Sequence, residues 1–202
     1  MSTCYIVGAG SFFGSFTPDA GDLVIAADGG YDQLIQHGYR CDLLIGDMDS
    51  IEKLPEGVEL VRHPVRKDET DTALAYLEGR QRGYESFTLI GCTGGRDDHT
   101  LANVALLLRA ARDGVMMKMV GERCDMWVLC RGVASVTGDE GKHLSVLAVG
   151  GDAEGVYIKG ASYEAENITL SEHFPLGVSN VFLDKPVSIR VTKGAVLITR
   201  ER

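Results

Sequence analysis

Short apolar runs alternate with helical segments through residues 1–131, and this alternation limits the possible folds more than any other feature of the chain. The apolar runs fall at residues 5–7, 23–27, 43–45, 58–61, 87–90, 115–120 and 126–129. Helical patterns fall at residues 31–37, from 71 to about 82, and at 98–112. Strands that are apolar along their whole length are buried on both faces, as in a parallel sheet covered by helices. Residues 1–131 are therefore predicted to form an α/β domain with a mostly parallel sheet.

The two longer helices are expected to be amphipathic. In the first, the predicted buried stripe consists of Ala73, Leu74 and Leu77. In the second, the apolar residues with helical spacing are Leu101, Val104, Leu108 and Ala111. Apolar residues at this spacing share one face of a helix, which would pack against the sheet.

The pattern changes after residue 131, where no helical periodicity is found. Short strands are predicted at residues 133–136, 144–148, 155–158, 178–183, 187–191 and 195–199. Turn signals such as Gly150-Gly151-Asp152 and Lys193-Gly194 separate them. Short strands at this spacing are typical of an antiparallel sandwich or barrel. Residues 132–202 are therefore predicted to form a separate all-β sandwich domain.

Charge and cysteine usage exclude several classes of protein. The chain of 202 residues has 20 basic and 29 acidic residues and a net charge of −9, so nucleic acid is not an expected partner because phosphate contacts need a basic face. The five cysteines are odd in number and none are spaced C-x-x-C, which favours reduced thiols and a cytoplasmic location. Neither a signal peptide nor a membrane span is predicted.

Glycine and aspartate follow the predicted strands. Gly8, Asp28, Asp47 and the 91–95 segment each come directly after an apolar run. The carboxyl ends of parallel strands meet at one edge of a sheet, and ligands of α/β proteins bind there. These residues are therefore expected to form one site.

Gly46-Asp47-Met48-Asp49-Ser50 is the most informative of these strand ends. If the backbone stays extended, Asp47 and Asp49 point the same way, and two such carboxylates repel unless a cation lies between them. Mg²⁺ takes oxygen ligands, usually one or two carboxylates together with water and substrate phosphates. The alternative is an ordinary turn, since Asp, Ser and Gly are common turn and cap residues.

Lys67-Asp68-Glu69-Thr70-Asp71 opens the first long helix. Asp68 is expected to cap the helix, with Asp71 three residues later in a capping-box-like position. Asp71 is also placed to turn toward a metal ion, and Lys67 and Thr70 are candidates for contacts with phosphate oxygens.

The segment 91–99, Gly-Cys-Thr-Gly-Gly-Arg-Asp-Asp-His, joins a strand to the second long helix. Free backbone N–H groups at a helix start bind anions, and glycines expose them. Arg96 is suited to bind phosphate with its planar guanidinium. Asp97 and Asp98 are partly caps, and one of them is a candidate substrate ligand. His99 is interpreted as a structural hydrogen-bonding residue.

A dinucleotide-binding motif is a weaker alternative. Gly8-Ala9-Gly10 follows a strand, and Asp28 ends the next strand about twenty residues later, as in that motif. However, Gly14 falls one position late for G-x-G-x-x-G. A dehydrogenase also has no need of the Asp47 and Asp49 pair.

The motifs together resemble those of the thiamine pyrophosphokinase family. Asp28-Gly29-Gly30, Gly46–Ser50, Lys67–Asp71 and Gly94–His99 occur in the order found in that family, and Gly177-Val178-Ser179-Asn180 is similar to its pyrimidine-contacting Ser-Asn loop. The resemblance spans nearly the whole chain. It implies an N-terminal α/β domain that binds ATP and Mg²⁺, a C-terminal β-sandwich that binds thiamine, and a homodimer with its sites at the subunit interface. Asp97 and Val181 depart from the family pattern.

The resemblance also implies a reaction, the transfer of a pyrophosphoryl group from ATP to the thiamine hydroxyl with release of AMP. The implied metal ligands are Asp47, Asp49 and Asp71, with Asp28 nearby. The implied residues around ATP are Gly29, Lys67, Thr70, Gly94, Gly95 and Arg96. Asp98 would bind thiamine or orient its hydroxyl, and Ser179 and Asn180 would contact the aminopyrimidine ring.

Two points stay open at this level. Phe174, Phe182 or Trp127 would stack on thiamine or belong to the core. The rival functions are another Mg²⁺-dependent phosphotransferase or phosphohydrolase, and a non-catalytic nucleotide- or thiamine-binding protein.

Overall fold

The computed structural model describes residues 2–48, 57–63 and 68–202. It contains two compact units. The first comprises residues 1–106 and 115–122, and the second comprises residues 107–114 and 123–202. Within the described residues, none of the helices is long and apolar enough to cross a membrane.

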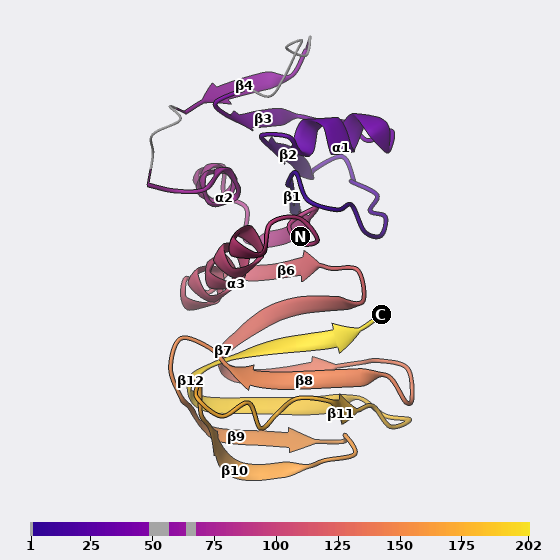
Figure 1. Ribbon diagram of the computed structural model, residues 1–202, viewed down its shortest axis with the longest axis vertical. Helices are drawn as coiled ribbons and strands as arrows, with labels where there is room; N and C mark the ends of the chain where they lie inside the picture. The colour runs from indigo at the N-terminus through magenta and orange to yellow at the C-terminus, as the bar shows by residue number, and fades with distance from the viewer. Residues whose placement is uncertain (1, 49–56, 64–67) are drawn as a thin grey trace. The chain divides into compact units, whose positions relative to one another are not determined.

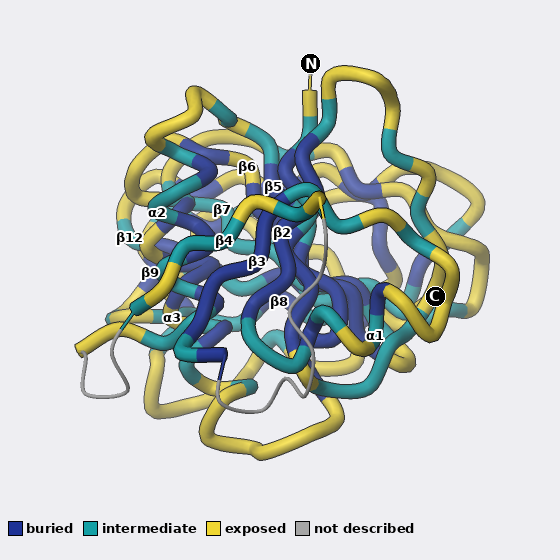
Figure 2. Tube along the Cα trace, turned by 90° about the horizontal axis from the view of Figure 1, so that it is seen from above, coloured by how far each residue is buried: buried dark blue, intermediate teal, exposed yellow. Residues whose placement is uncertain are grey.

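The first unit is built on a parallel sheet. Its described strands are β1 (Cys4–Val7), β2 (Leu23–Ala27), β3 (Leu43–Gly46), β4 (Glu59–Arg62), β5 (Ser86–Ile90) and β6 (Met116–Val120). They lie in the order β6-β5-β1-β2-β3-β4, and every neighbouring pair is parallel. β2 and β3 are buried along their whole length, as their dark blue colour in Figure 2 shows. The predicted parallel α/β arrangement is confirmed for this part of the chain.

Helices cover both faces of this sheet. α1 (Gly30–Gln36) lies on one face, and α2 (Asp71–Gln81) lies on the other (Figure 1). Leu34 of α1 packs with Val24, Ala26 and Leu44. On the opposite face Tyr76 of α2 makes an edge contact with the ring of Phe87, with centroids 5.1 Å apart. The third helix, α3 (Asp97–Arg112), follows β5 and contributes its first ten residues to this unit.

The predicted buried stripes of α2 and α3 were wrong in detail. The buried residues of α2 are Thr72, Ala75, Tyr76 and Gly79, whereas Ala73, Leu74 and Leu77 are only half-buried. The buried face of α2 contains small residues because the helix lies very close to the sheet. A Cβ at Gly79 would lie 2.6 Å from the Phe87 ring. In α3 the predicted Leu108 is buried, but Leu101 is 71% exposed, and the buried face also includes Asn103, Leu106, Leu107 and Ala110. Both buried faces thus begin with a polar residue, Thr72 or Asn103.

The second unit is antiparallel. Its strands are β7 (Cys124–Val136), β8 (His143–Ala148), β9 (Ala153–Lys159), β10 (Ala165–Leu170), β11 (Asn180–Val181) and β12 (Val187–Glu201). β12 pairs with β7 along nearly its whole length. Its first half also pairs with β9, and its second half pairs with β8, so two groups of strands share one long strand. A common core contains residues of β8, β9 and β12, including Val146, Val156 and Ile198.

The composition change near residue 131 coincides with a bend in β7. The expected boundary between residues 131 and 132 falls inside β7, where Arg131 and Gly132 have φ values of 48° and 123°. The partner strand β12 is irregular opposite them, between Val191 and Ala195. Left-handed residues and a register shift bend a strand pair. One short strand, β10, was not predicted, because half of its six residues, Ala165–Leu170, are polar and three are exposed.

The five cysteines are all free. Cys4 and Cys92 are buried, and the others are half-buried. Burial raises the pKa of the Cys92 thiol to about 12 and that of Cys41 to about 11, because it disfavours the thiolate. These two thiols are therefore protonated at neutral pH and are poor nucleophiles.

Candidate active site

The carboxyl ends of four neighbouring strands meet at one edge of the first unit. The register pairs Val7 with both Ala26 and Ile90, and pairs Ala27 with Ile45. The segments that follow β1, β2, β3 and β5 therefore leave the sheet at the same level. Gly8, Asp28, Asp47 and the 91–95 turn lie along this edge, as the alternation of strands and helices predicted.

Asp28 lies directly beside the end of β3. Its N–H donates to the carbonyl of Ile45 at 2.8 Å. A Cβ on Gly46 would lie 3.2 Å from the Asp28 Cα and 3.4 Å from its Oδ1. Asp28 itself has a φ of 47°, in the left-handed region that disfavours most side chains. The structure thus brings the Asp28 carboxylate next to the backbone that leads into Asp47.

The backbone after Asp47 turns sharply. Met48 has a φ of 63°, so the extended geometry assumed for Asp47 and Asp49 does not persist. Met48 is 7% exposed and packs with the core cluster that contains Val24 and Leu44. The buried Met48 side chain anchors this turn while Asp47 stays half-buried at the edge. Asp49, Ser50 and Lys67 lie outside the described residues.

Thr70, and not Asp68, caps α2. The Thr70 hydroxyl accepts a hydrogen bond from the Ala73 N–H at 3.2 Å, and the Thr70 backbone is extended, as an N-cap requires. The predicted cap at Asp68 was therefore wrong, and Asp68 is exposed. The Thr70 oxygen acts as an acceptor in this cap, so its O–H stays available to donate to a phosphate oxygen. Asp71 becomes the first helical residue and is half-buried.

Two glycine-rich turns interlock beside these carboxylates. The Gly10 N–H donates to the Gly91 carbonyl at 2.7 Å, and the Gly8 N–H donates to Ile90 at 2.8 Å. A Cβ on Gly91 would lie 2.5 Å from the Gly8 oxygen, and one on Gly10 would lie 2.5 Å from the Thr93 oxygen. Close backbone packing between the two turns therefore accounts for the Gly8-Ala9-Gly10 sequence, without a dinucleotide.

A cavity of about 340 Å³ opens between these turns and the starts of two helices. Its polar wall includes Thr72 of α2 and Asn103 of α3, which are 8% and 5% exposed. The Asn103 amide donates to the Cys92 carbonyl at 2.9 Å, which fastens the 91–95 turn to α3. Thr93 also lines the cavity, and its Oγ1 is buried with no hydrogen-bond partner in the described part of the chain.

Gly94 and Gly95 are exposed, and Gly95 lines this cavity. Gly94 has a φ of 75°, and its carbonyl accepts a hydrogen bond from the Ser11 hydroxyl at 3.1 Å. Gly95 and the following Arg96 line the cavity and are exposed. Exposed backbone at the start of a helix of this length is suited to an anion.

Arg96 and Asp98, which were predicted to have separate roles, are paired with each other. The Arg96 guanidinium donates to both Asp98 carboxylate oxygens, at 3.1 and 2.6 Å. These hydrogen bonds hold the pKa of the Asp98 carboxyl below its usual value. Asp98 Oδ1 also accepts from the His99 N–H at 3.0 Å. The two side chains are 74% and 61% exposed, so water competes for this ion pair and a substrate can exchange with either partner.

The described residues contain no group of three or more His, Cys, Asp or Glu side chains placed to hold a metal ion. Asp28 and the Gly46–Asp47 segment are adjacent, and Asp71 lies on α2, which packs against β2 and β3. Asp49, the remaining predicted ligand, lies outside the described residues.

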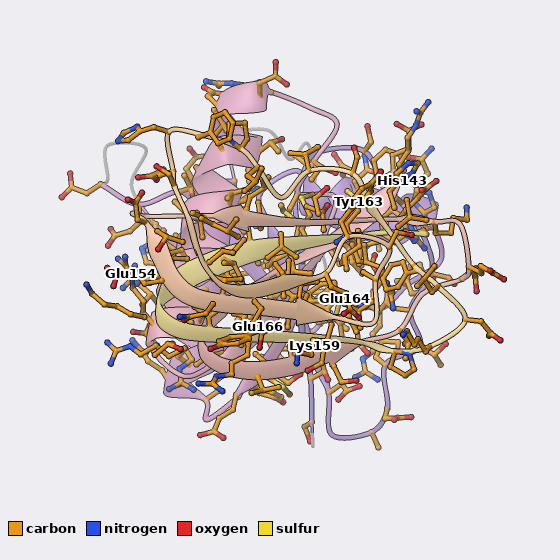
Figure 3. All side chains as sticks on the ribbon, turned by 90° about the horizontal axis from the view of Figure 1, so that it is seen from below. His143, Glu154, Lys159, Tyr163, Glu164 and Glu166 are labelled. Atoms are coloured by element: carbon orange, nitrogen blue, oxygen red, sulfur yellow. The ribbon has the colours of Figure 1, made fainter. Side chains whose placement is uncertain are left out.

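The second unit has its own cavity, of about 610 Å³. Its apolar wall is formed by Ile158, Ala165, Ile168, Leu170, Leu176 and Val178. The polar residues are Glu164, Glu166, Ser179 and Asn180, and none of the described lining residues is basic. Figure 3 shows Tyr163, Glu164 and Glu166, which come from the β9–β10 turn and the start of β10. The predicted Ser-Asn loop therefore belongs to a cavity that is apolar and acidic.

The candidates for aromatic stacking have different positions. Phe182 is fully buried, and Trp127 packs against the same core. Phe174 is 66% exposed but does not line the cavity. The aromatic residue that does line it is Tyr163, whose side chain is 72% exposed. Sequence reasoning missed Tyr163, and it also missed Thr72, Thr93 and Asn103, because single polar or aromatic residues inside an element resemble core or surface positions.

The first unit is thus a parallel α/β sheet whose carboxyl edge combines carboxylates with glycine turns, as in proteins that bind phosphate esters, and it is followed by an antiparallel unit with a separate apolar cavity. Two protein-family models match the chain. The family model described as the thiamin pyrophosphokinase catalytic domain matches residues 18–119, half of the chain, and the thiamin pyrophosphokinase vitamin B1 binding domain matches residues 134–196. The chain belongs to the thiamin pyrophosphokinase family of enzymes.

Individual relatives agree with this assignment. The thiamine pyrophosphokinase of Bacillus subtilis is 23% identical over 183 residues, which are 90% of this chain and 80% of that protein. Thiamine pyrophosphokinase 1 of Oryza sativa is 23% identical over 89% of this chain and 78% of its own length. The solved B. subtilis structure has a TM-score of 0.89 at 22% identity and covers 100% of this chain and 99% of its own. The Candida albicans enzyme has a TM-score of 0.75 at 14% identity, with coverage of 98% and 88%.

Proposed function

We propose that the chain transfers the terminal pyrophosphoryl group of ATP to the hydroxyl of thiamine and releases AMP. The observation that carries this proposal is the edge of the first unit, where the Asp28 carboxylate lies beside Gly46 and Asp47 and next to two interlocked glycine turns. Such an edge suits a triphosphate with its cation. The two family models, matched in the order catalytic then vitamin B1 binding, support the same reaction.

The carboxylate edge fits Mg²⁺. Its donors are oxygens only, and Mg²⁺ commonly uses one or two protein carboxylates with the rest of its shell from water and substrate phosphates. The described residues contain no cluster of three or more His, Cys, Asp or Glu side chains, and a Mg²⁺ ion with one or two protein ligands does not require one. We assign Asp47, Asp71 and Asp28 to hold it, together with Asp49. When bound, Mg²⁺ would neutralise phosphate charge and orient the phosphates for attack.

The remaining residues of the edge position the phosphates. The exposed backbone of Gly94 and Gly95 at the start of α3 offers N–H donors. Arg96 would leave Asp98 to bind the transferred group, which would free Asp98 to accept a hydrogen bond from the acceptor hydroxyl. Thr70 caps α2 and has its O–H available for a phosphate oxygen. Gly29 and Lys67 are assigned contacts with ATP from the family resemblance. In phosphoryl transfer, positioning and charge stabilisation of this kind supply most of the catalysis.

The cavity of the second unit is the proposed acceptor site. Thiamine carries a permanent cation on a planar ring, and a cavity with apolar walls, two carboxylates and no basic side chain among its described lining residues suits such a ligand. Ser179 lines this cavity and has a left-handed backbone conformation, with a φ of 60°. Its backbone N–H donates to Ser145 Oγ at 3.1 Å. This turn holds the Ser179 hydroxyl where it would donate a hydrogen bond to a ring nitrogen of the aminopyrimidine.

We further propose that the second unit is a β-sandwich, that the protein is a homodimer, and that it is cytoplasmic. The two strand groups that share β12 over one core support the sandwich. The exposed apolar side chains near the acceptor cavity, Phe174, Leu176 and Val178, support a subunit interface. The five free cysteines support a reducing compartment.

Consumption of ATP is expected to depend on both thiamine and a free divalent cation. With excess EDTA the rate should fall to background, and it should return when Mg²⁺ is added beyond the chelator. The control is a reaction with EDTA already saturated by Mg²⁺. A phosphohydrolase would consume ATP without thiamine, and a binding protein would consume none. Full activity in excess EDTA would contradict the assignment of Asp47, Asp71 and Asp28 to a metal.

A further inference from the structure

The Asn180 side chain makes three hydrogen bonds to the protein backbone. Asn180 is 6% exposed. Its Oδ1 accepts hydrogen bonds from the backbone N–H groups of Tyr163 and Val181, both at 2.9 Å. Its Nδ2 donates to the Tyr163 carbonyl at 2.7 Å. A primary amide has two donor hydrogens and two acceptor lone pairs, so three of its four hydrogen-bonding positions are used. The expected role of Asn180 as a donor and acceptor to the aminopyrimidine does not fit this geometry.

These hydrogen bonds fix the turn that carries Tyr163. The turn between β9 and β10 runs beside the segment 180–182, because Ser162 N–H donates to the Val181 carbonyl at 3.0 Å and Ala161 forms a bridge with Phe182. At the other side of the turn, the Gly160 N–H donates to Glu164 Oε1 at 2.7 Å. The Asn180 amide extends this pairing by one residue and binds both backbone groups of Tyr163. The backbone of Tyr163 is therefore rigid although its side chain is exposed.

Tyr163, which is labelled in Figure 3, lines the acceptor cavity, and the residue is 72% exposed. An exposed tyrosine on a fixed backbone offers a planar face at a small loss of conformational entropy, which suits an aromatic ligand. The lining of the cavity also includes aliphatic residues from β9 and β10.

We propose that Asn180 is a positioning residue that acts through Tyr163, and that the Tyr163 ring packs against the planar ring of the acceptor. This inference rests on the proposed function and assigns the aromatic contact that Phe174, Phe182 and Trp127 do not provide. Asn180 holds the Tyr163 backbone, and Tyr163 contacts the acceptor. Ser179, the neighbouring residue, keeps the polar contact with the ligand.

A double-mutant cycle on the full chain tests this arrangement. Thiamine KM, thiamine Kd by calorimetry and ATP KM are measured for Tyr163→Ala, Asn180→Ala and the double variant. Loss of the ring contact should raise the thiamine KM and Kd about tenfold, since an aromatic contact contributes up to about 1.5 kcal/mol. Asn180→Ala should have a similar effect. The double variant should be no worse than Tyr163→Ala, and ATP KM should not change.

Three further variants separate positioning from a general structural role. Tyr163→Phe keeps the ring and should keep the wild-type thiamine KM. Asn180→Asp keeps the acceptor oxygen but replaces the donor to the Tyr163 carbonyl, so it should also raise the thiamine KM, and it is the alternative if Asn180→Ala does not fold. Asn167→Gly is the matched control, because Asn167 is an exposed amide in β10, outside the cavity lining, with a φ of 52° that glycine adopts readily.

The outcomes distinguish this inference from the proposed function. Additive effects, about a hundredfold in the double variant, would show that Asn180 contacts the acceptor independently of Tyr163. An unchanged thiamine KM in Tyr163→Ala would also overturn the inference while the enzyme activity stands. A wild-type chain that neither binds thiamine nor uses it would overturn both.

Discussion

Replacing Asp47 by asparagine is expected to lower turnover at least about a hundredfold and to leave the free energy of unfolding within about 1 kcal/mol of wild type. The side chain keeps its shape and loses its charge, which the metal and the triphosphate require. Asp47 is half-buried at the strand end, next to the Gly46 backbone that contacts Asp28. The turn itself is anchored by the buried Met48, so it should survive the substitution.

Steady-state turnover and chemical denaturation of the same preparation check this expectation. Asp68→Asn is the matched control, because Asp68 is an exposed aspartate close to the start of α2 that does not cap the helix. That control should retain turnover. If Asp47→Asn instead lowered stability by several kcal/mol and kept its activity per folded molecule, Asp47 would be a turn residue and not a ligand.

Replacing Gly177 by alanine is expected to destabilise the second unit by about 2–3 kcal/mol. A Cβ at this position would lie 1.8 Å from the Val146 carbonyl oxygen, and no backbone hydrogen bond survives such a contact unchanged. The Val146 N–H donates to the Gly177 carbonyl at 2.8 Å, and the Ser179 N–H donates to Ser145 Oγ. The added methyl group must therefore push the loop of residues 177–180 away from β8.

Thermal unfolding and the thiamine KM should both respond to Gly177→Ala, because the loop positions Ser179. Val178→Ala is the control for stability, since the neighbouring side chain is 51% exposed and its removal creates no clash. A wild-type melting temperature in Gly177→Ala would mean that the loop is held loosely, and the fixed presentation of Ser179 would have to be abandoned.

The sheet of the first unit could be predicted closely from sequence. β2 was expected at residues 23–27, and the structure has it as Leu23–Ala27. Runs that are buried on both faces leave an unambiguous apolar signal, and their parallel pairing follows from the intervening helices. The meeting of Gly8, Asp28 and Asp47 at one edge follows from the same topology.

The helix faces and the second unit were harder to predict. The inner face of α2 is made of Thr72, Ala75, Tyr76 and Gly79, and hydrophobicity cannot identify a face that packs through small residues. β7 and β12 contain 13 and 15 residues, but Gly132 and Gly194 at their shared bend resemble turn residues. Local sequence does not distinguish a bend in a long strand from the end of a short one.

Side-chain roles depended on individual hydrogen bonds that sequence patterns did not predict. Thr70 caps α2 in place of Asp68, because the Thr70 hydroxyl accepts the hydrogen bond from the Ala73 N–H. Arg96 and Asp98 pair with each other, which their two-residue separation did not predict. The Asn180 amide is occupied by Tyr163, 17 residues earlier in the chain. The Asn180 hydrogen bonds require the relative placement of two loops, and the local pairs depend on the rotamers that the side chains adopt; the sequence pattern contains neither.

The most direct test of the account is the identity of the nucleotide formed from ATP. Purified full-length protein is incubated with ATP, Mg²⁺ and thiamine, and the products are separated and quantified. Transfer of an intact pyrophosphoryl group predicts AMP and thiamine diphosphate in equal amounts, with neither formed when thiamine is omitted. Formation of ADP with thiamine monophosphate, or release of phosphate from ATP without an acceptor, would contradict it.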